Sequence, residues 1–96
     1  MTIYVRTMGI LSVEMPGQMT VQMGSAAGLT LRCLIFDRLA SKHDPRLPGV
    51  LFDAQEGLQP GYTILIDGRN AMQLGGLDLV LWDGANVLIT ALVSGG

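Results

Sequence analysis

The chain has 96 residues, a formal net charge of −2 and only 15% charged residues, a length that suits one domain able to form a core without metals or disulfides. Its basic residues are scattered, which argues against the positive stripe of a nucleic-acid-binding protein. One cysteine allows no internal disulfide, no apolar run reaches about 20 residues, and no signal peptide precedes the first strand pattern, so we expect a cytoplasmic protein with no membrane partner.

The first part of the chain predicts a hairpin followed by a helix. Apolar and polar residues alternate in "TIYVRTM", residues 2–8, and again in "MTVQM", residues 19–23, as in half-buried strands. Thr30 is a candidate helix N-cap, and proline at position 45 requires the helix to end earlier. We therefore predict a helix at about 30–42. Its apolar stripe at three- and four-residue spacing consists of Leu31, Leu34, Ile35 and Leu39.

The second part predicts a loop and further strands. Residues 43–61 are rich in proline and glycine, so we expect an irregular segment with a short strand at 50–52. "YTILI", residues 62–66, is apolar throughout, which predicts a central strand covered on both faces. Asp67-Gly68 predicts a type I′ turn, and a second "DG" turn at 83–84 precedes a last strand at 86–93. Together these elements predict an α+β fold, with one main helix packed on a mixed sheet.

Motifs for enzyme chemistry are missing from the sequence. We expect Cys33 to be a buried structural thiol and His43 to lie at a solvated helix end, and they are too few ligands for a zinc site. The aspartates, Asp44 among them, are spread through turns and the helix surface. Gly75-Gly76 is expected to be a backbone turn rather than a phosphate-binding loop.

The sequence ends in Gly95-Gly96 directly after the last predicted strand. Glycine has no Cβ, so such an end is thin enough to enter a narrow slot in a partner enzyme. Its terminal carboxylate can then be activated as an acyl-adenylate and passed to a nucleophile. The alternative is an ordinary frayed terminus.

These residues carry a family resemblance that covers essentially the whole chain. The order of elements, and above all "LQPGYTILIDGRNAMQLGGLDLVLWDGANVLITALVSGG" at 58–96, resembles the sulfur carriers of the MoaD/ThiS family. The family pattern there is a strand, "NGR", "GLDT-L-DGD", a strand and "GG"; Asp67 and Ala85 are departures from it. The resemblance implies one ubiquitin-like β-grasp domain at 1–96, with four to five strands on one helix and a flexible tail at 94–96.

The resemblance also implies a function. In this family a protein similar to ubiquitin-activating enzymes adenylates the last glycine with ATP, and a sulfur donor converts it to a thiocarboxylate. In the MoaD branch the tail then enters the large molybdopterin synthase subunit. By matching positions, Gly96 bears the acyl group and sulfur, beside Gly95. The partner holds Ser94, Val93 and Leu92. The chain is then a co-substrate rather than an enzyme, and it binds no cofactor or metal itself.

Other functions stay open. The chain can be a ubiquitin-like modifier joined to lysines through Gly96, or a sulfur carrier for thiamine synthesis or tRNA thiolation. It can also be a non-catalytic β-grasp binding module, since fold does not fix function. Trp82 and Leu88 are candidate exposed contacts near the tail, with burial in the core as the alternative. A β-grasp ferredoxin is excluded because an iron–sulfur cluster needs several cysteines.

Overall fold

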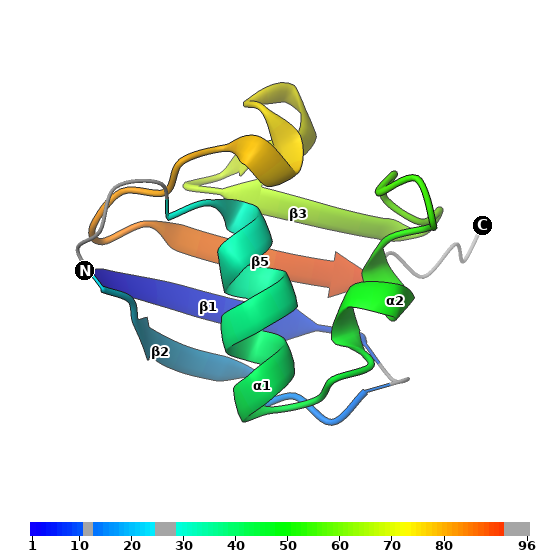
Figure 1. Ribbon diagram of the computed structural model, residues 1–96, viewed down its shortest axis with the longest axis horizontal. Coiled ribbons are helices and arrows are strands. Elements are labelled where there is room, and N and C mark those ends of the chain that lie inside the picture. The colour runs from blue at the N-terminus through cyan, green and yellow to red at the C-terminus, as the bar shows by residue number, and fades with distance from the viewer. Residues whose placement is uncertain (11–12, 25–28, 92–96) are drawn as a thin grey trace.

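A mixed sheet of five strands organises residues 1–10, 13–24 and 29–91, which the computed structural model describes (Figure 1). The strands are β1 (Thr2–Met8), β2 (Gln18–Gln22), β3 (Tyr62–Ile66), β4 (Arg69–Asn70) and β5 (Asn86–Ala91). Their order is β2-β1-β5-β3-β4, with β1 and β5 parallel and the other neighbours antiparallel. The predicted α+β arrangement on a mixed sheet is confirmed.

The main helix begins where the sequence predicts. The Thr30 hydroxyl accepts a hydrogen bond from the backbone N–H of Cys33 at 3.2 Å, so Thr30 acts as the N-cap. Leu31 and Arg32 are helical, followed by the π-helical segment η1 (Cys33–Leu39) and by α1 (Ala40–Lys42). The range predicted for the helix is confirmed, but the sequence did not indicate its π-helical middle. His43 follows at the exposed end, as predicted.

The core lies between this helix and one face of the sheet, and Figure 1 shows the helix crossing in front of the strands. All four residues of the predicted helix stripe are fully buried. The strand residues buried beneath them are Ile3, Val5, Val21, Ile64, Ile66, Val87 and Ile89. β1, β2, β3 and β5 thus turn alternate residues toward the helix and leave their opposite face open.

The expected strand at 50–52 is wrong. The segment instead forms α2 (Leu47–Leu51), and Phe52 makes only an isolated bridge with Leu58. Pro48 occupies the first turn of α2, where a fixed φ favours helix and the missing N–H costs nothing. Leu47 and Leu51, one turn apart, are both fully buried, so packing stabilises a helix that is too short to be recognised from periodicity.

Residues 62–66 form an interior strand, as predicted, because β3 has β5 on one side and β4 on the other, but its two faces are not both covered. β3 pairs with β5 along its length and with β4 only at Leu65 and Ile66. Leu65 is half-buried on the open face, opposite Leu88 of β5. The apolar run therefore reflects a cross-strand leucine pair rather than a second covered face.

The turns after β3 and before β5 have the predicted locations. Asp67 and Gly68 have φ values of 50° and 80°, as a type I′ turn requires. The second turn is closed by the Ala85 N–H, which donates to the Trp82 carbonyl at 3.1 Å. Two 3₁₀ segments, η2 (Ala71–Gln73) and η3 (Gly76–Asp78), lie between these turns, and the glycines at 75 and 76 form the expected backbone turn.

Candidate functional site at the end of strand β5

Strand β5 delivers the chain to a fixed point of the sheet. It is paired on one side with β1, up to Thr90 opposite Met8, and on the other with β3, where Ala91 is opposite Tyr62. Gly9, the residue after β1, has φ +74°, and a Cβ there would lie 3.1 Å from the Ala91 carbonyl oxygen. Ala91 is therefore held closely between the end of β1 and the beginning of β3.

The residues predicted to do the chemistry follow that point. Gly96 and Gly95, and the stalk residues Ser94, Val93 and Leu92, lie outside the described residues. Their predicted roles remain predictions, and the structure adds the geometry of the strand that leads to them. The predicted last strand at 86–93 is described as far as Ala91.

Trp82 and Leu88 lie apart from each other, and Trp82 is not near the described end of β5. The Trp82 indole N–H donates to Asp67 Oδ2 at 2.9 Å, and the Asp67 backbone N–H donates to the Asn86 carbonyl. Trp82, 39% exposed, therefore lies beside the beginning of β5, at the end opposite Ala91. Leu88 lies in the middle of β5 on the open face, where it is half-buried.

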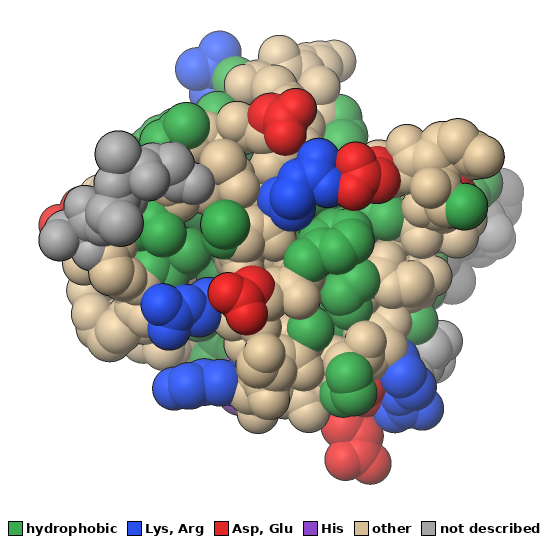
Figure 2. Space-filling view, in the orientation of Figure 1, with side chains coloured by type: hydrophobic (Ala, Val, Ile, Leu, Met, Phe, Trp, Pro, Cys, Tyr) green, Lys and Arg blue, Asp and Glu red, His purple; other side chains and the backbone are tan. Residues whose placement is uncertain are grey.

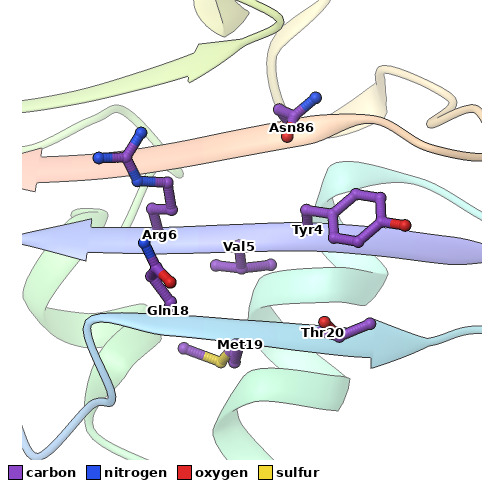
Figure 3. A pocket seen from close by; sticks show the side chains of 7 residues that line it. All are labelled: Tyr4, Val5, Arg6, Gln18, Met19, Thr20 and Asn86. Carbon is purple, nitrogen blue, oxygen red and sulfur yellow. The ribbon is translucent and has the colours of Figure 1, made fainter.

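The open face of the sheet carries two hollows that the sequence alone did not reveal. The larger, about 410 Å³, is lined by residues of β1, β2 and β5, shown in Figure 3: Tyr4, Val5, Arg6, Gln18, Met19, Thr20 and Asn86. The smaller, about 260 Å³, lies toward β3 and is lined by Arg6, Leu65, Gly68, Asn86, Val87 and Leu88. Tyr4 and Arg6 alternate with core residues in the sequence, and this alternation predicts that they lie on the open face of the sheet. It does not predict which residues of other strands lie next to them.

Arg6 and Asn86 line both hollows, so they lie between them on the open face. Arg6 is exposed and makes no ion pair with any residue that the structure describes. The rest of the lining mixes amide and hydroxyl groups with Tyr4, Leu65 and Leu88. Such a surface suits contact with a protein partner more than chemistry on a small molecule.

The helix face is organised differently. Figure 2 shows an apolar patch on this face beside a cluster of basic and acidic side chains. Arg32 pairs with Glu56 and with Asp78, and its guanidinium carbon lies 5.9 Å from the centre of the Phe36 ring. The Glu56 hydrogen bond is the main cause of the raised pKa of Arg32. Glu56 and Asp78 neutralise the charge of Arg32, so this side chain does not form a binding site for an anion. Its two ion pairs instead join the helix to neighbouring loops.

One expectation about a titratable residue is wrong, that for Cys33. Asp44 lies in the turn after the helix, as expected for the aspartates, but it is buried. It accepts hydrogen bonds from the Arg46 side chain and from the backbone N–H of Glu14, and these bonds hold its pKa well below the usual range. Cys33 is only partly buried, and hydrogen bonding to Thr30 lowers the pKa of its thiol. Contrary to the expectation, the thiol is not fully buried, because Cys33 lies beside the buried stripe of the helix and not in it.

Neither residue belongs to a larger reactive cluster. Within the described ranges, no three His, Cys, Asp or Glu side chains are placed to hold a metal ion. No helix in the described part of the chain is long and apolar enough to cross a bilayer. The features of the described molecule that bear on function are therefore the end of β5 and the open face.

Comparison with known proteins identifies the fold of this chain. No protein-family model matches the sequence, and no curated protein matches it. The structure is similar to the solution structure of Urm1 from Trypanosoma brucei, with a TM-score of 0.76 and 26% identity over 99% of this chain and 95% of Urm1. It is similar to small archaeal modifier protein 1 (SAMP1) from Methanosarcina acetivorans, with a TM-score of 0.70 and 25% identity over 99% and 96% of the two chains.

A third similar structure contains a partner. It is the BexX/CysO complex from Amycolatopsis orientalis, with a TM-score of 0.64 and 22% identity over 98% of this chain and 99% of the matched one. The predicted β-grasp fold and the resemblance are thereby confirmed: the chain has the ubiquitin-like β-grasp fold, and its structural neighbours are of the MoaD/ThiS type. Within that class its structural neighbours are ubiquitin-like sulfur carriers or modifiers.

Proposed function

We propose that this protein is a sulfur carrier whose working group is the Gly96 carboxylate. The observation that carries the proposal is the position of β5, which is paired on both sides and ends at Ala91. Five residues, Leu92 to Gly96, follow that fixed point. Fully extended, five residues reach at most about 18 Å, enough to enter a partner while the domain stays outside.

The chemistry takes place at one carbonyl carbon. A carboxylate oxygen of Gly96 attacks the α-phosphorus of ATP, and pyrophosphate leaves. A sulfide donor then attacks the carbonyl carbon of the acyl-adenylate, the C–S bond forms, and AMP leaves with the bonding electrons of the C–O bond. The product is a thiocarboxylate. Glycine at 95 and 96 keeps the approach to this carbon unhindered, because neither residue has a Cβ.

The proposal requires two protein partners and no bound cofactor. A cytoplasmic adenylating protein similar to ubiquitin-activating enzymes uses the ATP, and a second protein accepts the sulfur. The complex of CysO with BexX supports the idea that proteins of this fold dock on another protein. For the acceptor we propose the large subunit of molybdopterin synthase, as the "DG…DG…SGG" series suggests, with the chain as its co-substrate rather than an enzyme.

A second function is favoured by one comparison. SAMP1 is described as a modifier protein, and it covers nearly the same length as this chain. The same acyl-adenylate, attacked by a lysine amine instead of sulfide, would give an amide bond to another protein. The two functions share the first step and differ only in the nucleophile.

The experiment is the intact mass of the protein after incubation with ATP, an adenylating enzyme from its host and a sulfide source. We expect a gain equal to replacement of one oxygen by sulfur, and none in a variant that lacks Gly96. An adduct sensitive to Gly96 loss on other proteins of a host lysate would instead support the modifier function. Absence of both, with an enzyme shown to be active on another carrier, would reject activation at Gly96.

A further inference from the structure

The two edges of the sheet differ in how they are protected. β4 forms one edge, but it is only two residues long, and both are exposed. The chain leaves the sheet directly after it, because the Asn70 side chain accepts a hydrogen bond from the Met72 N–H and caps η2. β2 forms the other edge, visible as the lowest strand in Figure 1, with five residues and no charged side chain. Natural proteins usually block such an edge with charges, proline or a covering segment.

The hydrogen bonds between β1 and β2 show which backbone groups of β2 are free. Met1 and Met23 exchange two hydrogen bonds, and the Thr7 N–H donates to the Gly17 carbonyl. Because bonded and non-bonded pairs alternate in an antiparallel ladder, the odd-numbered residues of β2 point their backbone groups toward β1. The even-numbered residues Gln18, Thr20 and Gln22 therefore direct their N–H and C=O groups outward.

We propose that two copies of this protein associate through antiparallel pairing of their β2 strands, about a two-fold axis at Thr20. In that register Thr20 is opposite Thr20 of the second copy, and Gln18 is opposite Gln22. Each of these pairs exchanges two backbone hydrogen bonds, so every outward group of the three residues gains a partner. The two sheets, each of five strands, become one continuous sheet.

The side chains favour a second copy over an unrelated chain. β2 is uncharged, so the two-fold axis brings no like charges together. On the helix side of the sheet, Met19 is opposite Val21 of the second copy, in the pair type in which side chains approach most closely. Met19 is only partly buried in the single chain, while Val21 is 7% exposed, so the pairing covers the remaining apolar surface of Met19.

The association is expected to be weak, since one pair of five-residue strands buries less surface than a standard stable interface. It leaves the end of β5 free, because β1 separates β2 from β5. The two-fold axis reverses the strand direction, so the two β5 strands point toward opposite ends of the joined sheet. The dimer would then offer two carrier tails to two partners at the same time.

The first test is sedimentation of the full chain over a wide concentration range, with T20K and Q73K as variants. Thr20 and Gln73 are both exposed, and each change adds one positive charge, but Gln73 lies in η2, away from β2. We expect the unchanged protein and Q73K to dimerise as concentration rises. T20K places two lysines across the axis and should weaken association by about fivefold or more.

The second test distinguishes this dimer from any other. Backbone amides of Gln18, Thr20 and Gln22 should exchange rapidly with solvent at low concentration and become protected as dimer forms. Those of Met19 and Val21 should be protected throughout, because they bond to β1. The proposal is overturned if the protein stays monomeric at millimolar concentration, if T20K dimerises as well as Q73K, or if the three outward amides exchange equally at all concentrations.

Discussion

At the scale of single residues, Asp44 shows how a carboxylate is held in the described core. Its oxygens accept bonds from the Arg46 guanidinium at 2.7 Å and from the Glu14 N–H at 3.0 Å, so it joins the segment after the helix to the loop that connects β1 and β2. Because these bonds favour the charged form, the folded-state pKa lies below the ordinary value of 3.8. The contribution to stability is therefore present above that value and is lost as the pH falls below it.

Asp44→Asn should accordingly lower the free energy of unfolding at neutral pH, and the difference from the unchanged protein should shrink below pH 3.8. Denaturant unfolding at several pH values measures both effects. Asp37→Asn, at an exposed helix position, removes the same charge and should leave the midpoint nearly unchanged. Equal midpoints for Asp44→Asn and the unchanged protein at neutral pH would contradict this account.

Gly9 offers a second prediction at this scale, because its backbone has φ +74° and lies close to the Ala91 carbonyl. Gly9→Ala should cost about 1–2 kcal/mol of stability, since Cβ is unfavourable in the left-handed region. Gly17→Ala is the matched control in the same loop: its φ is not in that region and nothing lies within 4 Å of the added Cβ. It should be neutral or slightly stabilising in thermal unfolding, and an equal loss for both changes would refute the argument.

At the scale of secondary-structure elements, the main helix depends on its first turn. The Thr30 hydroxyl satisfies the Cys33 N–H, which would otherwise lack a partner at the helix end. Thr30→Ala should destabilise the protein by about 0.5–2 kcal/mol, while Thr30→Ser should retain most of the stability. Denaturant unfolding followed by circular dichroism measures both, and an equal loss for the two variants would show that the hydroxyl is not the cause.

Elements whose apolar pattern repeats over several turns could be predicted from the sequence. Elements that depend on a single residue pair, or on a contact with a distant part of the chain, could not. The helix stripe from Leu31 to Leu39 repeats over more than two turns, so its period is clear in the sequence. α2 has a single buried pair, Leu47 and Leu51, set among proline and glycine, and it resembles a loop. Burial of Asp44 depends on a backbone group thirty positions away, which no local pattern reveals.

The candidate site was likewise only partly predictable. The glycine tail can be recognised from residues 95 and 96 alone, although its role stays a prediction. The open-face hollows depend on strand register, which sets Tyr4 beside Asn86 and Arg6 beside Gln18. Alternation assigns each residue to a face of its own strand, but only the pairing of strands shows which residues become neighbours.

At the scale of the whole molecule, folding and sulfur transfer should be separable. The strand pairings of β5 that the structure describes involve only residues up to Ala91, so removal of Gly95 and Gly96 should change the free energy of unfolding by less than about 0.5 kcal/mol. The same truncation should abolish the mass gain expected for thiocarboxylate formation. A comparison of thermal unfolding with intact mass tests both parts, and a large loss of stability would show that the tail also supports the domain.

The central position of β5 has a consequence for how the molecule reaches its folded state. Within the sheet, the hairpin of β1 and β2 and the hairpin of β3 and β4 are joined only through β5, which comes last along the described chain. The pairing of Tyr4 with Asn86 closes a loop that spans most of the sequence, and such distant contacts slow folding. Because the same strand positions the tail, a chain presents its tail from a rigid support only once the whole sheet has assembled.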